Sequence, residues 1–341
     1  LDIVQVGHQL NLIDVNTAHE AAIIVFEPDF LVDISSIAHC FTDYGHHPFA
    51  YLLHAFEPSF INQPILLGYF AGAALDDIIN QKGDYHWQET LKKSFKEQAL
   101  AYCACKDFNQ KEDFKTAAIR QTQHIESIVK ALFDAPLSQT TAPTGEAVYN
   151  RNKAVLEPSF VCEALGLQGR VDLMTTDFKL LVEQKSGNNF NLQRQQPNSF
   201  GSYQLENHYV QLLLYYGVLR QNFNVSTQHI AMRLLYSKYP LPGGLVAVNF
   251  YQKLFREAIA LRNRIVAHEY RFGKQGFQGI IETLSVDMLN EKKLETPFFK
   301  QWIAPQLNGI IAPLHALTPL EKAYFERMVS FVFSEQLAAK V

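Results

Sequence analysis

The sequence predicts a mixed α/β fold, in which a mixed sheet is flanked by helices and preceded by a largely helical N-terminal region. The sheet is predicted by three short runs rich in apolar and β-branched residues, 155–163, 167–175 and 178–185, with turn residues between them. The helices are predicted by the apolar periodicity of residues 65–135 and of residues 203–222. Together these patterns place a small sheet between helical segments.

We expect three consecutive parts: 1–150, mostly helical; 151–275, the sheet-containing core; and 276–341, a helical C-terminal extension. The first part begins with short apolar segments around 23–26. A linker containing Thr, Pro and Gly, at 138–146, precedes the core.

In the core, a polar loop at 188–202 that contains Arg194 should follow the third strand, as either a substrate-guiding loop or a disordered one. The later elements are predicted as a helix, a strand, a turn, a long helix and a final amphipathic helix, at 203–222, 228–236, 239–244, 250–272 and 317–339.

The polar residues of the predicted strands indicate a metal site. Side chains alternate along a strand, so Glu183 and Lys185 project together while Gln184 points the other way. If Asp172 ends a neighbouring strand, two carboxylates and a lysine converge. Mg²⁺ prefers oxygen ligands, so Asp172, Glu183 and the backbone carbonyl of Gln184 are candidate ligands. Such a site suits metal-assisted phosphodiester hydrolysis, in which Lys185 would orient water or stabilise developing charge.

Two simpler interpretations stay open. An exposed Glu/Lys pair at a strand edge is usually a solvated ion pair worth under about 1 kcal/mol. On the predicted helix, Gln211 and Tyr215 are four residues apart and share a face, with His208 one turn earlier. They form either a second part of the site or an ordinary packed face with Tyr215 in the core.

The order of these motifs resembles a known family. Gly169-Arg170-Val171-Asp172, then residues 183–187 (Glu-Gln-Lys-Ser-Gly), then Gln-x-x-x-Tyr at 211–215 resemble the RecB-type branch of the PD-(D/E)xK nucleases. Residues 165–172 are most similar to the nuclease half of helicase-nucleases that trim DNA flaps during replication. Weaker similarity extends over about residues 25–270, at Pro28 to Val32, Leu66 to Gly68 and Arg262-Asn263.

The resemblance implies a restriction-endonuclease-like core and a Mg²⁺- or Mn²⁺-dependent DNA nuclease acting on single-stranded or flap DNA. It implies that Asp172 and Glu183 bind the metal, that Lys185 is catalytic, and that Gln211 and Tyr215 support the site and the substrate strand. Glu163 is a further acidic candidate, more simply explained as an exposed strand residue.

Two departures from the family pattern matter. Many RecB-type nucleases have a metal-binding histidine four residues after the glycine of the Leu-Gly element, where this chain has Gly72. Asp76 or Asp77, one turn later, is the candidate replacement, and activity with one metal or a manganese requirement would fit the loss of the histidine.

Close relatives also hold an iron-sulfur cluster with one early and three late cysteines. The cysteines here are Cys40, Cys103, Cys105 and Cys162, so we expect no cluster.

Composition favours an intracellular, cytoplasmic enzyme: the chain is 48% apolar, has four scattered cysteines, and shows no signal peptide or membrane-length apolar run. The net charge of −4 is unusual for a strong duplex binder and fits a preference for single strands. Basic residues concentrate locally and could form phosphate-facing stripes or solvated helix faces: Lys92, Lys93 and Lys96, and Arg256, Arg262, Arg264, Arg271 and Lys274.

The sequence contains no P-loop motif, so we expect any linked helicase to lie beyond Val341, with this chain as an excised nuclease region. Two alternatives stay open. One is a restriction-type endonuclease acting on duplex sites. The other is a catalytically degenerate nuclease-fold module that binds DNA or serves as a scaffold, which the glycine at position 72 would favour.

Overall fold

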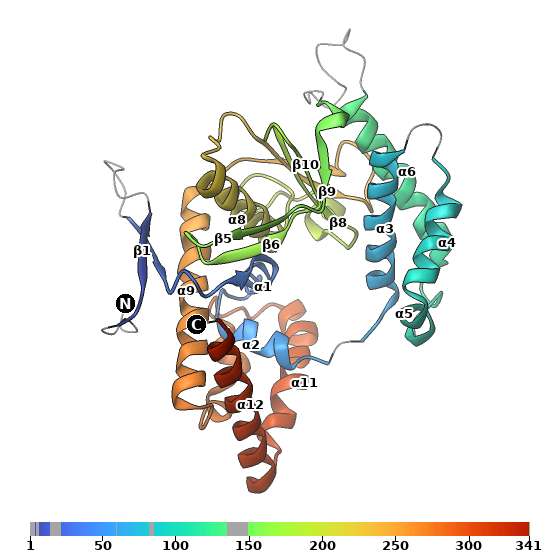
Figure 1. Cartoon of the computed structure of the whole chain (residues 1–341). Helices are drawn as coiled ribbons and strands as arrows, with labels where there is room; N and C mark the ends of the chain where they lie inside the picture. Colours follow the sequence, from blue (N-terminus) through green and yellow to red (C-terminus); the bar gives the residue numbers. More distant parts are fainter. Residues whose placement is uncertain are drawn as a thin grey trace.

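The computed structural model describes residues 4, 7–13, 22–58, 60–81, 85–134 and 149–340. The predicted linker at 138–146 lies outside these residues. The fold is mixed α/β, as predicted: two sheets at the centre are covered by helices, and a β-hairpin lies to one side (Figure 1).

The larger sheet has five strands in the order β10-β9-β8-β7-β4. Strands β8 and β9 are parallel and the other neighbours are antiparallel. The strands are β4 (Ala154–Leu156), β7 (Leu173–Thr175), β8 (Leu180–Lys185), β9 (Ala231–Tyr236) and β10 (Leu245–Val248). Strand β9 and the turn at 239–244 confirm two predictions, whereas β10 was not predicted.

The smaller sheet has the order β3-β6-β5, with β3 parallel to β6. Its strands are β3 (Val32–Asp33), β5 (Ser159–Cys162) and β6 (Leu167–Arg170), and the side hairpin is β1 (Leu10–Ile13) with β2 (Ile23–Phe26). Because β3 comes from the N-terminal region, this sheet draws on both sides of residue 150.

The prediction of continuous strands at 155–163 and 167–175 was wrong, because each run is broken into two strands in different sheets. Pro158 has no N–H to donate, and Glu157 has a left-handed φ of 49°. The second break, at Val171-Asp172, faces the first. Glu157 N donates to Asp172 O (3.0 Å) and Val171 N donates to Pro158 O (3.3 Å), so both strands bend at the same height.

The helical predictions for 65–135, 203–222, 250–272 and 317–339 are confirmed, and a short helix, α7, lies in the predicted polar loop. Asn189 caps the N-terminus of this helix, because its side chain accepts a hydrogen bond from Leu192 N. The α-helices are α1 (Ile34–His39), α2 (Phe49–Phe56), α3 (Gln63–Asn80), α4 (Trp87–Glu97), α5 (Ala99–Ala104), α6 (Phe114–Phe133), α7 (Phe190–Arg194), α8 (Glu206–Phe223), α9 (Gln252–Gln275), α10 (Val286–Leu289), α11 (Ala304–His315) and α12 (Pro319–Lys340). Short helical turns occur at η1 (Arg151–Lys153), η2 (Ile281–Thr283) and η3 (Phe299–Ile303).

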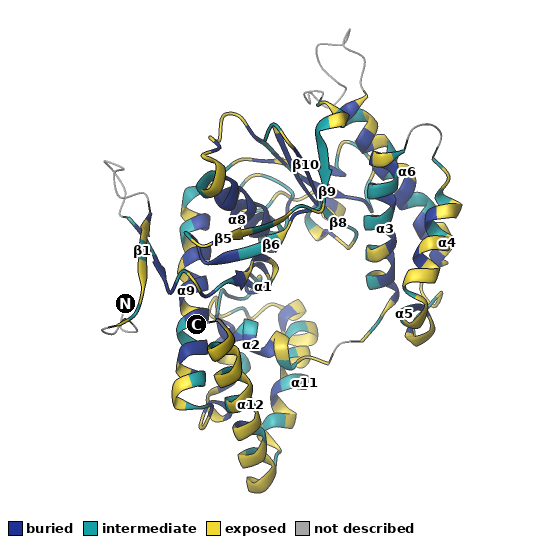
Figure 2. Ribbon diagram, in the orientation of Figure 1, coloured by how far each residue is buried: buried dark blue, intermediate teal, exposed yellow. Residues whose placement is uncertain are grey.

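The large sheet is covered on both faces. Leu180 and Val182 of β8 pack in the cluster with α3 and α6, whereas Leu181 belongs to the cluster with α8 and α9. This alternation turns Glu183 toward α8. Helix α8 is buried along most of its length, while α12 is largely exposed (Figure 2). No helix among the described residues combines the length and apolar character of a membrane span.

A buried arginine joins the N-terminal segment to the core. Arg262 of α9 is 0% exposed, and its guanidinium donates to the carbonyl oxygens of Phe26, Glu27, Phe30 and Gly166. Gly166 has φ +62°, and a side chain there would overlap the guanidinium. Arg262 therefore cannot belong to a phosphate-facing stripe, and the proposed stripe on α9 was wrong at this position.

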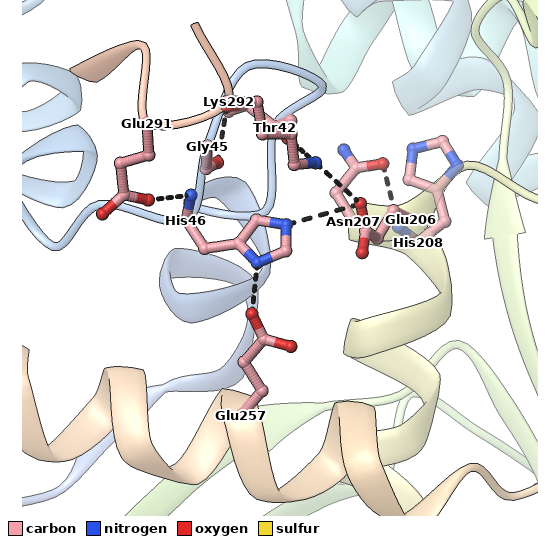
Figure 3. A network of polar contacts seen from close by, with 9 residues as sticks. All are labelled: Thr42, Gly45, His46, Glu206, Asn207, His208, Glu257, Glu291 and Lys292. Atoms are coloured by element: carbon pink, nitrogen blue, oxygen red, sulfur yellow. Dashed lines mark hydrogen bonds and ion pairs between the residues drawn. The ribbon is translucent and has the colours of Figure 1, made fainter. Parts of the chain in front are cut away.

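A second polar network joins the loop after α1 to three other segments (Figure 3). The His46 ring contacts Glu257 of α9 through Nδ1 (2.6 Å) and Glu206 of α8 through Nε2 (3.4 Å). His46 N donates to Glu291 in the C-terminal extension, and Lys292 pairs with Glu206 at 3.6 Å. Burial opposes the charge on His46, but the two glutamates outweigh it and raise the pKa of the imidazole above 6.5.

We predict that Arg262→Lys lowers the free energy of unfolding by about 3 kcal/mol or more, because an ammonium offers fewer donors than the guanidinium fork and leaves buried carbonyls unpaired. Arg264→Lys, on the same helix with a side chain 49% exposed, should change it by less than about 0.5 kcal/mol. Urea denaturation of both variants measures the change in the free energy of unfolding. Equal losses in the two variants would contradict the role of Arg262 in joining the segments.

The His46 network should make stability depend on pH. Because the folded pKa is raised, the contribution of His46 is complete below pH 6.5 and is lost as the pH rises through the folded pKa. We expect His46→Gln to destabilise the protein by on the order of 1 kcal/mol at pH 6, less as the pH increases. His229→Gln, in an exposed loop, is the control. Thermal unfolding of the parent, His46→Gln and the control from pH 5.5 to 9 measures this loss of stability. A loss of the same size at every pH would contradict the prediction.

Candidate active site

The register of the large sheet brings the two predicted carboxylates together. Strand β7 pairs antiparallel with β8, with Leu173 opposite Val182. Extending the pairing by one residue places Asp172 directly opposite Glu183, where side chains lie on the same face. The Asp172 carboxylate then accepts a hydrogen bond from Gln184 N at 2.6 Å.

Glu183 is a buried acid with only one of its two oxygens bonded. The residue is 3% exposed. Its Oε1 accepts from Lys185 Nζ at 3.0 Å and from Gln211 Nε2 at 2.6 Å. Its Oε2 is buried and accepts no hydrogen bond from any described residue. An unpaired buried acceptor is costly and calls for a missing partner.

Lys185 and Gln211 lock this acid in place. Besides bonding Glu183, Lys185 Nζ donates to Gln211 Oε1 at 2.8 Å. The three residues form a closed triangle between β8 and α8. An ammonium has three protons, so one proton of Lys185 is left for a ligand. Lys185 lines a cavity of about 330 Å³ together with Asp172, so a ligand can reach it.

Tyr215 supports the segment before Asp172 rather than the acids themselves. Its hydroxyl donates to Arg170 O at 2.6 Å. The ring lies against Gly169, where a Cβ would approach the ring carbon at 3.0 Å and the hydroxyl at 3.2 Å. The glycine of the Gly-x-Val-Asp motif thus leaves room for the tyrosine.

Gln184 joins three parts of the site. Its side chain donates to Ala71 O of α3 at 3.0 Å, on the sheet face opposite Glu183, as alternation predicts. In a strand, the N–H and C=O of one residue point to the same side. Because Gln184 N faces Asp172, its carbonyl also points toward the β7 side, the direction required of a third ligand.

Burial and mutual repulsion disfavour charge on the acids. Burial, reinforced by Asp172, raises the pKa of Glu183 to about 8, against the opposing effect of Lys185. Burial also raises the pKa of Asp172. The pKa of Asp76 on α3 is raised to about 6, by burial and then by the charges of Glu157 and Asp172. Burial is therefore the main reason that the charged forms of these three acids are disfavoured.

The structure distinguishes between Asp76 and Asp77, the two acids that the family resemblance suggested in place of a histidine at position 72. A side chain added at Gly72 would meet no atom within 4 Å, and Gly72 lines the cavity. Asp76, one turn later on α3, interacts electrostatically with Asp172. Asp77 instead accepts a hydrogen bond from Thr90 at 2.5 Å and pairs with Lys93 at 3.9 Å, so its role is structural.

Other candidates lie at or away from the site. His208 lines the cavity and bonds Tyr236 through Nδ1 (3.1 Å); burial lowers its pKa to about 3, which keeps it neutral. Glu163 is exposed in the turn between β5 and β6, at the far end of that hairpin from Asp172. Glu157, whose charge acts on Asp172, was missed, because only the facing strand breaks bring it near. The cysteines are free thiols: Cys40, Cys105 and Cys162 are buried and Cys103 is exposed.

Among the described residues, no group of three or more His, Cys, Asp or Glu side chains is arranged to hold a metal ion. A divalent ion would therefore depend on two carboxylates, a carbonyl and water, a donor set that suits Mg²⁺. The unpaired Oε2 of Glu183 fits such an ion.

Comparisons with known proteins give little further information. No protein-family model and no curated protein matches the chain. Among solved structures, the chain is similar to one named "Putative exonuclease" from Eubacterium rectale, with 12% identity, a TM-score of 0.37, and coverage of 72% of this chain and 81% of that one.

We predict that Glu183→Gln stabilises the metal-free protein at high pH. Since the folded pKa of about 8 exceeds 4.5, the glutamate takes up a proton on folding and destabilises the fold as the pH rises from 4.5 to 8. The amide removes this effect, which should approach about 5 kcal/mol at pH 8, at about 1.4 kcal/mol for each pKa unit. Thermal unfolding in EDTA from pH 5 to 8.5 should show a gain that grows with pH. A variant less stable than the parent at pH 8, or an equal gain in the exposed-site control Glu163→Gln, would contradict this.

Proposed function

We propose that this chain is a metal-dependent nuclease with a PD-(D/E)xK active site, which hydrolyses phosphodiester bonds in single-stranded or flap DNA. One observation carries the proposal: Glu183 has a buried carboxylate oxygen with no partner among the described residues, and the acid interacts with Lys185 and Asp172, which both line a cavity. An ordinary surface ion pair would have both oxygens solvated, and Glu183 is 3% exposed.

Asp172, Glu183 and the carbonyl of Gln184 would hold Mg²⁺ or Mn²⁺. When bound, such an ion neutralises charge on the phosphate and lowers the pKa of bound water. The raised pKa values of both acids support this assignment, because burial disfavours their charged forms and a bound cation would compensate that charge. Asp76, whose charge interacts with that of Asp172, is the candidate further acid for a second ion.

Lys185 is the residue we assign to catalysis. Two of its protons are used by Glu183 and Gln211, which fixes the direction of the side chain. The third is available to an attacking water or a non-bridging phosphate oxygen, where charge develops in the transition state. Gln211 and Tyr215 act as positioning residues, one on the Glu183–Lys185 pair and the other on the Asp172 segment.

A second candidate function is a DNA-binding module that has lost catalysis. It is favoured by Gly72, which leaves the family's histidine position empty, and by the lack of three clustered metal-binding side chains among the described residues. Under this alternative the fold and the cavity persist, but metal binding is absent.

End-labelled single-stranded, flap and duplex DNA, incubated with Mg²⁺ or Mn²⁺, tests the proposal. We expect metal-dependent cleavage that Lys185→Ala reduces at least about 100-fold, the usual cost of removing a transition-state donor. Lys179→Ala removes an exposed lysine just before the same strand and should retain activity. Discrete fragments from duplex alone would favour a restriction-type endonuclease. Binding without cleavage would favour the non-catalytic module.

A further inference from the structure

A large groove adjoins the candidate active site. It has a volume of about 670 Å³, and its walls come from the loop after α1, from α7 and the loop that follows, from the start of α8 and from the C-terminal extension. Leu205 lines both the groove and the cavity at the carboxylates, so the two adjoin at this residue. His39, in the groove wall, also interacts electrostatically with Lys185.

Two exposed aromatic rings mark the groove. Phe190 of α7 and Phe298, just before η3, are 46% and 49% exposed. Their ring centroids are 6.4 Å apart and their planes meet at 67°. The guanidinium of Arg194 lies 5.9 Å from the centre of the Phe190 ring. The contact of Arg194 with the Phe190 ring is itself favourable, and the two exposed rings offer apolar surface on which a ligand can stack.

The groove also contains an unsatisfied polar group. Gln204 is 2% exposed, yet its side-chain Oε1 accepts no hydrogen bond from any described residue. Its backbone carbonyl is held by the side chains of Asn191 (3.2 Å) and Asn198 (2.7 Å), so its place in the wall is fixed. An N–H donor on a ligand would satisfy this acceptor.

Charge in the groove suits a strand held mainly by its bases. Arg194 supplies a cation for one phosphate, and Glu206 in the wall is neutralised by His46 and Lys292. Asp43, also in the wall, has no ion pair with another described residue and opposes close packing of phosphates. A net charge of −4 likewise limits binding through phosphates alone.

We propose that this groove binds an unpaired DNA strand, stacking its bases on Phe190 and Phe298 and leading its backbone past Leu205 to the carboxylates. The inference rests on the proposed function, since the adjoining cavity is what makes DNA the occupant. Bases in a duplex are stacked on each other and cannot present their faces, so the groove selects single strands over duplex.

Fluorescence anisotropy with a labelled oligothymidylate tests the inference on the whole chain, in EDTA to prevent cleavage. We expect Phe190→Ala and Phe298→Ala each to weaken binding at least fivefold, the lower end of the effect of losing one stacked base. Phe190→Trp should retain the affinity. Phe223→Ala is the matched control: Phe223 is 48% exposed and lies at the other end of α8, about 25 Å from the groove. It should leave the affinity unchanged.

Equal affinities for the parent and both groove variants, binding of duplex as tight as of single strands, or no binding at all would overturn the inference. In each case a segment of a protein partner becomes the better occupant. Hydrolysis of a small phosphodiester, bis-p-nitrophenyl phosphate with Mn²⁺, separates this result from the function. Stacking-dependent binding without hydrolysis would refute the nuclease and retain the groove. Hydrolysis without stacking-dependent binding would support the nuclease and refute the groove.

Discussion

The site depends on one constraint, the paired break in the hairpin formed by residues 154–162 and 167–175. The register of the hairpin continues across the break, because Leu156 pairs with Leu173, Ser159 pairs with Arg170, and the residues between them, Glu157-Pro158 and Val171-Asp172, bond each other. The halves of the hairpin then join different sheets. Asp172 lies at this break but stays in register opposite Glu183, and its carboxylate accepts a hydrogen bond from Gln184 N. Without the break, β5 and β6 would lie in the large sheet, and the bend at Asp172 would be lost.

Several buried polar contacts hold Asp172 and Glu183 in place at the bend, at the cost of stability. Tyr215 fixes Arg170, and Gln211 with Lys185 fixes Glu183, so the acids meet on a rigid support. Glu183 nevertheless keeps an unpaired oxygen in the interior. Buried groups that are incompletely satisfied lower stability, and proteins retain them where function requires them. We therefore propose that the constellation is a site for a cation, with one proton of Lys185 left for a substrate.

The sequence predicts what is local and misses what depends on distant contacts. Alternation alone places Glu183 and Lys185 on one face, and helical spacing places Gln211 and Tyr215 on one face of their helix. Only the family resemblance predicted that Gln211 would support the acids, which it does by bonding Glu183. The break at Asp172 was missed, because it arises from Pro158 and from pairing across the hairpin. Arg262 was assigned to the surface, since periodicity does not show that four carbonyls from two distant segments converge on it. Helix α7 was missed because five residues are too few to show a period.

The same distinction applies to the surroundings of the site. The His46 network and the groove both require the C-terminal extension to pack near α8, and no local pattern encodes that contact. The aromatic residues Phe190 and Phe298 are more than one hundred positions apart, so sequence alone gives no reason to pair them. Long-range packing thus determines which residues surround the predicted acids.

The most direct test of the account is calorimetric titration of the unmodified chain with Mn²⁺, alongside Asp172→Asn and the exposed-site control Glu163→Gln. The account predicts saturable binding that Asp172→Asn abolishes and Glu163→Gln leaves unchanged, because the two central carboxylates supply the charged ligands. Absence of binding to the unmodified chain, or equal binding by Asp172→Asn, would contradict the metal site and with it the proposed chemistry.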